Sequence, residues 1–272
     1  MHSIRDFYRE LNLSVSGVEV RKRWEAFRKD VTGFVMDGFI KDGVTVVIGA
    51  GNMNDIDIKT IADASANIVL ADIDAKTLSE NSSGRIETAE IDFGCIDGIN
   101  QVKNIKELLE FLRTESPGVK SSISNRVFDN IIVSPFYTQL VLPWVFAMFP
   151  DIQPTSEITD AALEFTGKII KLANVYIRKL ASDGCRLCLW TDILEYDAHD
   201  PAFADIKNNI ADNSWMDAFL EQYTNEFGYG LGTYGHIEME EHLVETDYKW
   251  LIWPFDKDRR LIVKITSGFP VE

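Results

Sequence analysis

Residues 44–58, VTVVIGAGNMNDIDI, decide the fold. A run of mostly β-branched residues stops at Gly49, and a polar segment that suits the start of a helix follows. Such a turn ends a parallel strand, and its free backbone N–H groups can bind ribose or phosphate oxygens. The glycines lack a Cβ, so a ligand can approach the backbone closely. The stretch therefore predicts a nucleotide-binding turn between a buried strand and a helix.

Apolar runs alternate with helical patterns on both sides of this turn. Further strands are expected at 67–74, 86–93, 126–136 and 185–194, with helices around 101–114 and 157–181. The segment 248–269 holds two aromatic and β-branched runs around a polar turn, which predicts a terminal hairpin. The pattern predicts an α/β fold: a doubly wound, mostly parallel seven-stranded sheet with helices on both faces and a C-terminal antiparallel β-hairpin.

Two regions outside this alternation complete the expected organisation. Residues 1–41 place apolar side chains at spacings of three and four, which predicts an N-terminal helical extension before a single domain at 42–272. Residues 195–213 read as irregular, a short helix is expected near 214–226, and GYGLGTYGH at 228–236 reads as a mobile loop.

The composition of the chain restricts the kinds of partner that it can bind. The chain of 272 residues carries 43 acidic and 27 basic side chains, a formal net charge of −16, which repels nucleic acid and anionic membrane surfaces. The basic run at 21–29 is interrupted by apolar residues and reads as a solvated helix face. Three cysteines are too few for a disulfide framework, and no segment resembles a secretion signal or a membrane span. We expect a cytoplasmic protein and leave a homo-oligomer open.

An acidic residue follows the second strand at a suggestive distance. Asp72 lies 21 positions after Gly51, at the predicted end of a strand, where a carboxylate can accept hydrogen bonds from ribose hydroxyls. Asp74 is the near alternative.

These residues resemble a family. The segments VTVVIGAGN, IVLADID, AEIDF and FDNIIVSPF are similar to the successive strand ends of class I S-adenosylmethionine-dependent methyltransferases, whose sheet also ends in an antiparallel pair. The resemblance implies S-adenosylmethionine as cofactor, with the glycine turn at its methionine part, a carboxylate on its ribose, and the third and fourth strand ends at its adenine and methyl group. The matching residues are Gly49, Ala50, Gly51, Asn52, Asp72, Ile73, Asp92, Phe93 and Ser134. The chain departs from the family at Val47, where an acidic residue is usual, and at Met53, where a third glycine is common; this leaves the source of the contact to the cofactor's ammonium group open.

The acceptor side of such a site is less defined. We expect a small-molecule substrate with an unspecified acceptor atom, and Tyr137, Tyr234 and His236 are the candidate catalytic residues, with Tyr229 beside them. The segment SPFY at 134–137 half-resembles the loop of amino-group methyltransferases, but Phe136 replaces its second proline. The N-terminal aromatic residues Phe7 and Tyr8 are candidates for a lid.

Two other functions stay open at this point. An NAD(P)-dependent Rossmann reductase shares the opening IGAGNM, and a methyltransferase-like scaffold without catalysis would keep the same fold. No metal is expected: Cys185 and Cys188 would face opposite sides of a strand, and His236 and His242 lack the spacing of a zinc motif.

Overall fold

The computed structural model describes the chain apart from residues 1–3, 75–77, 79–83, 95, 153–155 and 272. Within that part of the chain the centre is one sheet of eight strands in the order β4-β3-β2-β1-β5-β6-β8-β7. The strands are β1 (Val44–Ile48), β2 (Asn67–Asp72), β3 (Ile86–Phe93), β4 (Val119–Ser121), β5 (Phe128–Val133), β6 (Ala181–Asp197), β7 (Leu243–Trp253) and β8 (Arg259–Pro270).

The inner strands are parallel. β1 lies between β2 and β5, β3 continues the sheet beyond β2, and β6 continues it beyond β5, all in the same direction. The three remaining strands, β4, β8 and β7, run antiparallel to their neighbours. Because parallel strands are covered on both faces, the continuous apolar runs of β1 and β5 predicted them correctly. The expected doubly wound, mostly parallel sheet with a terminal antiparallel hairpin is confirmed.

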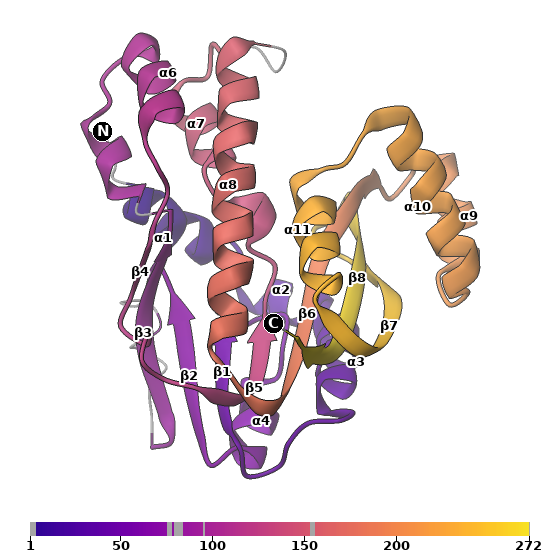
Figure 1. Ribbon diagram of the computed structural model, residues 1–272. Coiled ribbons are helices and arrows are strands. Elements are labelled where there is room, and N and C mark those ends of the chain that lie inside the picture. The colour runs from indigo at the N-terminus through magenta and orange to yellow at the C-terminus, as the bar shows by residue number, and fades with distance from the viewer. Residues whose placement is uncertain (1–3, 75–77, 79–83, 95, 153–155, 272) are drawn as a thin grey trace.

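Helices cover both faces of this sheet (Figure 1). They are α1 (Ile4–Ser14), α2 (Val18–Arg23), α3 (Glu25–Met36), α4 (Ile58–Ala64), α6 (Ile105–Thr114), α7 (Leu142–Met148), α8 (Glu157–Lys179), α9 (Pro201–Asn209), α10 (Asn213–Phe227) and α11 (Leu231–Glu240), with short 3-10 turns η1 (Ile96–Gln101) and η2 (Tyr137–Gln139). Val46 and Ile48 share a core with α8, while Val47 points to the opposite core with α3. This alternation follows from the two-residue period of a strand.

The N-terminal segment belongs to both cores. Ile4 and Tyr8 of α1 are buried with the α8 core, and Phe27 and Val31 of α3 with the other. The helices expected within residues 1–41 are therefore present and packed on the sheet, and the domain boundary at residue 42 stays a prediction.

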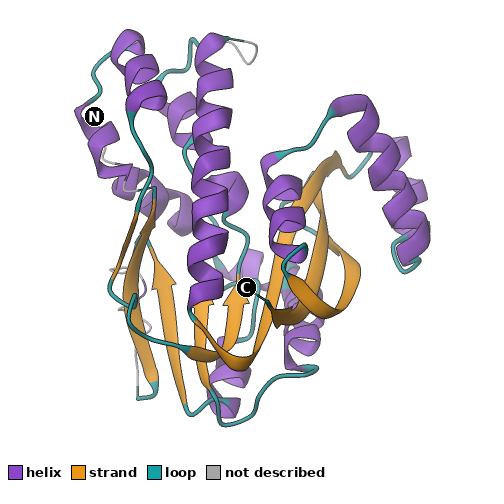
Figure 2. Ribbon diagram, viewed as in Figure 1, coloured by secondary structure: helices purple, strands orange, loops and turns teal. Residues whose placement is uncertain are grey.

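The far end of the sheet carries a smaller lobe. β6 pairs with β8 as far as Asp197, well beyond the end of β5. A third apolar cluster forms there between the long strands and α9 and α10, which lie at one side of the molecule (Figure 2). Phe203, Met216 and Trp250 are buried in this cluster.

Three expectations about local structure need correction. The sheet has an eighth strand, β4, whose three residues give too short a run to recognise. Residues 195–213 are not irregular, because they continue β6 and form α9. Most of 228–236 is the start of helix α11 rather than a mobile loop. A Cβ at Gly232 would collide with the carbonyl oxygen of Asp192, so at least this glycine allows close packing rather than motion.

Candidate functional site

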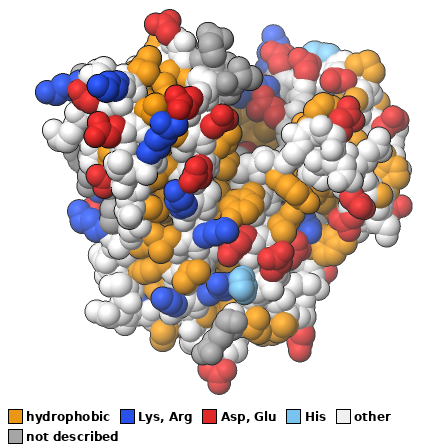
Figure 3. All heavy atoms as spheres, turned by 45° about the horizontal axis from the view of Figure 1, so that its top comes forward, with side chains coloured by type: hydrophobic (Ala, Val, Ile, Leu, Met, Phe, Trp, Pro, Cys, Tyr) orange, Lys and Arg blue, Asp and Glu red, His pale blue; other side chains and the backbone are white. Residues whose placement is uncertain are grey.

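A cavity of about 330 Å³ lies where β1, β2 and β5 end. Its lining includes the glycine turn after β1, Asp72 at the end of β2 and Ser134 after β5. Ligands of open α/β sheets bind outside the carboxyl ends of the strands, and the volume falls in the range of small-molecule sites. On the face drawn in Figure 3 the surface is hollowed beside the lobe of α9 and α10, and hydrophobic side chains gather there.

The glycine turn has the backbone that its sequence predicts. Gly49 and Gly51 have φ angles of +70° and +49°, in the left-handed region that favours glycine. An added Cβ on Gly49 would lie 3.2 Å from Cβ of Phe136, and one on Gly51 would lie 3.2 Å from Oδ1 of Asn12. Met53 has a φ of +53°, so the position where the family often has a third glycine does adopt a glycine-like conformation.

Asp72 is held rigidly at the cavity wall. Its Oδ2 accepts a hydrogen bond from the backbone N–H of Gly51 at 3.0 Å, and its Oδ1 accepts one from the N–H of Asp74 at 2.9 Å. Each carboxylate oxygen has a second lone pair, so the group can still accept bonds from a ligand. Burial raises the pKa of Asp72 above its usual range, despite these bonds. Asp74 instead pairs with Arg9 of α1, with Oδ1 3.3 Å from Nε.

Helix α1 closes this side of the cavity. Tyr8, Leu11 and Asn12 line it, and the carbonyl oxygen of Asn12 accepts a hydrogen bond of 2.9 Å from Nδ2 of Asn52. The hydroxyl of Tyr8 is buried without a hydrogen-bond partner among the described residues. Such a hydroxyl lowers stability, because it has lost its hydrogen bonds to water without gaining others.

The two residues expected at the end of the third strand, Asp92 and Phe93, lie in different surroundings. Phe93 lines the cavity, and its ring lies 5.2 Å from that of Phe136 in a stacked arrangement. Asp92 is fully buried and outside the cavity lining, and its Oδ2 lies 3.6 Å from Nη2 of Arg5. Its carboxylate helps hold α1 through Arg5, and the expected contact of Asp92 with an adenine group stays a prediction.

Asp55 is a site residue that the sequence did not single out as one. It lines the cavity with 7% of its surface exposed, and its Oδ2 accepts bonds from Oγ of Ser134 at 3.4 Å and Nε1 of Trp190 at 3.3 Å. Burial raises the pKa of Asp55 to about 6. The sequence allowed Asn54 or Asp55 to cap the next helix, but Asp57 does so by accepting bonds from Lys59 and Thr60.

A half-buried carboxylate, Asp192, lines the cavity from β6. Both oxygens of Asp192 are close to Oγ1 of Thr138, at 3.2 and 3.1 Å, and burial raises the pKa of Asp192 to about 6. The sequence carried a signal for it, because Asp192 lies near the end of a predicted parallel strand, as Asp72 does.

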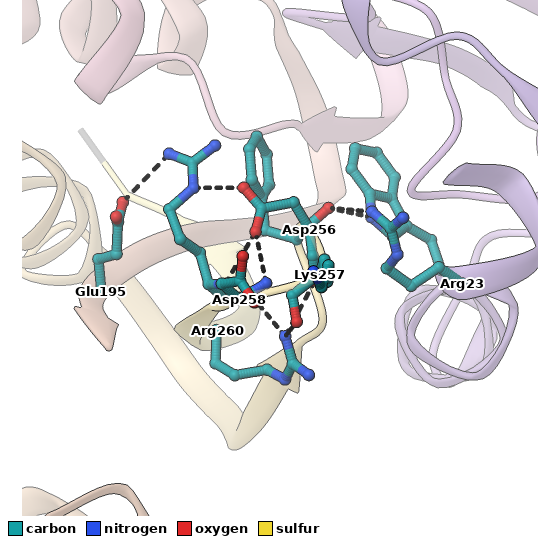
Figure 4. Close-up of polar contacts among 9 residues, drawn as sticks. Arg23, Glu195, Asp256, Lys257, Asp258 and Arg260 are labelled. Carbon is teal, nitrogen blue, oxygen red and sulfur yellow. Dashed lines mark hydrogen bonds and ion pairs between the residues drawn. The ribbon is translucent and has the colours of Figure 1, made fainter. Parts of the chain in front are cut away.

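The turn between β7 and β8 forms an aromatic rim. Trp24, Trp253 and Phe255 line the cavity, with the rings of Trp24 and Trp253 4.7 Å apart. Nε1 of Trp24 donates to the carbonyl oxygen of Phe255 at 2.9 Å. The guanidinium of Arg259 lies between Glu195, at 3.8 Å, and Asp256 (Figure 4). The rim is therefore fixed by polar contacts from three parts of the chain.

The three candidate catalytic residues lie outside the cavity lining. Tyr137 is buried and donates to Oδ1 of Asn174 at 2.7 Å, while Tyr234 packs near Lys171 of α8. His236 is buried with Nε2 2.9 Å from Oγ1 of Thr266, and burial lowers its pKa to about 3. These side chains fasten η2, α8 and α11 to the sheet, so the interpretation of all three as groups that touch a substrate has no support in this geometry.

The remaining candidates are structural. Cys185 and Cys188 point to opposite cores of the sheet as free thiols, and burial raises the pKa of both, that of Cys185 to about 12. Cys95 lies outside the described residues. Within the described ranges, no group of three or more His, Cys, Asp or Glu residues could hold a metal ion.

In the part of the chain that the structure describes, no helix combines the length and apolar character that a membrane span requires.

Comparison with known proteins gives similarity in structure only. No protein-family model matches the chain. No curated protein matches it in sequence. Among solved structures, it is similar to phosphoethanolamine N-methyltransferase 2 of Haemonchus contortus, solved with phosphomonomethylethanolamine and S-adenosylhomocysteine, at 9% identity over 100% of this chain and 61% of that chain, with a TM-score of 0.45. It is also similar to a methyltransferase-like protein of Bacillus halodurans, at 9% identity over 89% and 100% of the two chains and a TM-score of 0.39. Human N-acetylserotonin methyltransferase with its S-adenosylmethionine matches at 11% identity over 96% and 56%, with a TM-score of 0.38. At these scores the similarity carries no inference about the activity of this chain.

Proposed function

We propose that the protein is an S-adenosylmethionine-dependent methyltransferase that acts on a small molecule. The observation that carries the proposal is the charge of the strand-end cavity. The glycine turn and the carboxylate of Asp72, which could bind a ribose, suit a nucleoside. The other charged residues of the lining are Asp55, Asp192, Glu195 and one basic residue, Arg259, so the cavity is acidic. S-adenosylmethionine has a nucleoside without any phosphate and carries a sulfonium and an ammonium, so an acidic cavity complements it.

The residues present fit the parts of this cofactor. Asp72 would accept hydrogen bonds from the ribose hydroxyls, since two backbone N–H groups already fix its position. Phe93 and Ile73 offer apolar surfaces at the same end for the adenine.

The bound cofactor would supply an electrophilic methyl group on a sulfonium sulfur. The thioether leaving group would need no acid, because the sulfur already carries a positive charge. The chain then has to align an acceptor, exclude water and remove a proton where the acceptor carries one. Asp192 is placed for the last role, because its pKa of about 6 leaves it ionised at neutral pH and able to accept a proton. Trp253 and Phe255 give the acceptor an apolar wall.

The acidic lining also weighs against a dinucleotide. A Rossmann reductase binds a pyrophosphate at the N-terminus of the helix after the glycine turn. Here that helix begins at Ile58, with its first N–H groups occupied by the Asp57 cap and the buried carboxylate of Asp55 nearby. Two carboxylates at that place would repel a pyrophosphate.

The proposal extends to location and substrate class. The free, buried thiols of Cys185 and Cys188 are consistent with a reducing cytoplasm. The net charge of −16 supports a small-molecule acceptor over a nucleic acid.

Calorimetric titration with S-adenosylhomocysteine and with NADH tests the proposal. We expect saturable binding of S-adenosylhomocysteine only, and Asp72→Ala should weaken it by roughly tenfold to a hundredfold, since bonds to a charged group contribute about 1.5–3 kcal/mol. Asp63→Ala, an exposed carboxylate of α4, is the matched control and should bind as the wild type does.

The other outcomes separate the rival functions. Binding of NADH alone would establish the reductase. A protein that binds neither ligand would be the scaffold without catalysis.

A further inference from the structure

Asp55 is a buried carboxylate that has no ion-pair partner among the described residues. Its side-chain partners, the hydroxyl of Ser134 and the indole of Trp190, are neutral donors that reach the same oxygen, Oδ2, and its own backbone N–H is a further neutral donor. Among the described residues no cationic nitrogen forms an ion pair with it. Arg28 influences it from α3, but the guanidinium of Arg28 donates to the carbonyl oxygens of Asn54 and Arg21 at 3.0 and 3.2 Å.

A buried carboxylate in this state needs a cation from elsewhere. Removing an ion from water costs several kcal/mol unless an opposite charge and hydrogen bonds replace the solvent. Among the described residues no side chain donates to Oδ1 of Asp55, and the residue lines the cavity. The arrangement therefore calls for a ligand that brings a positively charged donor to this point.

The position of Asp55 along the sheet identifies the end of the ligand that it faces. The strand order places β2, with Asp72, on one side of β1, and β5 and β6 on the other. Ser134 follows β5 and Trp190 belongs to β6, so the partners of Asp55 lie on the opposite side of β1 from Asp72. A nucleoside at Asp72 would extend its 5′ substituent over the glycine turn toward Asp55.

We propose that Asp55 binds the α-ammonium group of the methionine part of S-adenosylmethionine through a charge-assisted hydrogen bond. The assignment rests on the proposed function and adds a specificity residue to it. Val47 is fully buried in the core shared with α3 and does not line the cavity, so the position two residues before the glycine turn cannot provide this contact. Asp55 provides the charge from farther along the same loop.

A ligand-based double-mutant cycle tests this contact. Calorimetry compares S-adenosylhomocysteine with its des-amino analogue, which keeps the carboxylate and lacks only the ammonium, on the wild type and on Asp55→Asn. The wild type should bind S-adenosylhomocysteine about 10- to 100-fold more tightly than the analogue, as expected for a charged hydrogen bond. On Asp55→Asn the two ligands should bind within about threefold of each other.

The control makes the same chemical change outside the cavity. Asp63→Asn replaces an exposed carboxylate of α4, and it should keep the wild-type preference for the ammonium. 5′-Methylthioadenosine, which lacks the whole amino-acid part, should bind Asp55→Asn and the wild type equally.

The outcomes distinguish failure of the Asp55 assignment from failure of the proposed function. Equal binding of the two ligands by the wild type overturns the assignment, whether or not Asp55→Asn folds. A preference that survives in Asp55→Asn, or that disappears in Asp63→Asn, also overturns it. If the wild type binds none of the three adenosine ligands, the proposed function falls and the assignment falls with it.

Discussion

Replacement of Gly235 by Ala should destabilise the protein although alanine favours helices. Gly235 lies in α11, and an ideal Cβ there would lie 2.7 to 2.8 Å from three ring atoms of Tyr137. The ring cannot easily move away, because it is buried and its hydroxyl donates to Asn174 at 2.7 Å. Overpacking of this kind costs about 1–3 kcal/mol, against a helix-propensity gain of about 0.5–1 kcal/mol. The free energy of unfolding should fall by roughly 0.5–2 kcal/mol.

Gly33→Ala in α3 isolates the propensity effect. No heavy atom lies within 4 Å of an ideal Cβ at Gly33, and this residue is exposed, so the variant should gain about 0.5–1 kcal/mol. Urea unfolding followed by circular dichroism measures both variants beside the wild type. If Gly235→Ala is as stable as Gly33→Ala, the ring of Tyr137 does not pack on α11, and residues 228–236 form the loop that their sequence suggests.

Three further results should follow from the geometry of the site. Tyr8→Phe removes a buried hydroxyl without a partner among the described residues, so the free energy of unfolding should rise by about 1–3 kcal/mol in urea unfolding; an unchanged or lower stability would show that this hydroxyl is hydrogen-bonded in the folded protein. Burial raises the pKa of Asp55 to about 6, so the folded protein binds a proton between about pH 4 and 6 that the unfolded chain has released. The stability that comes from this protonation is fully present below about pH 4 and is lost as pH rises through 6. Asp55→Asn should therefore be more stable than the wild type at pH 7.5, on the order of 1–3 kcal/mol, and should lose this advantage toward pH 4. A stability difference that stays constant across this pH range would refute the argument. His236→Ala breaks the bond to Thr266 and should lower stability by about 1–3 kcal/mol without changing the dissociation constant of S-adenosylhomocysteine, measured by urea unfolding and calorimetry; a large loss of binding with intact stability would return His236 to the site.

The fold could be predicted because most of its strands can be recognised from their own residues alone. The buried parallel strands β1 and β5 are short runs of β-branched and apolar residues bounded by turn signals, and a continuous apolar run needs no knowledge of its partners. β4 gives no such signal, since its three residues are held mainly by pairing with the edge of β3. Its existence depends on tertiary contacts.

Helix α11 shows why glycine misleads a local interpretation. Its sequence, LGTYGHIEME, holds two glycines that lower helix propensity, and four glycines in 228–235 read as a loop. In the structure Gly232 faces the backbone of β6 and Gly235 faces the ring of Tyr137. Close approach, rather than flexibility, accounts for both, and a single sequence does not distinguish the two uses of glycine.

The site was predictable only where its geometry is local. Gly49, Gly51 and Asp72 follow from strand ends and spacing, and the bond between Gly51 and Asp72 links them. Asp72 and Asp92 look equivalent in sequence, because each ends or nearly ends a strand. They differ in space because Arg5 of α1 reaches Asp92, a contact across 87 residues that no pattern contains.

The departures from the family pattern at Val47 and Met53 have a common physical explanation. The loop between β1 and α4 spans residues 49–57, and within it Met53 adopts a φ of +53°, a conformation that costs a residue with a side chain about 1–2 kcal/mol. Such strain persists only where the surrounding structure enforces it, and it concentrates at functional sites. Here the strained turn returns the chain toward β5 and β6, where Asp55 meets Ser134 and Trp190. An acidic residue at position 47 would be buried in the core with α3, whereas Asp55, which this loop carries, lines the cavity.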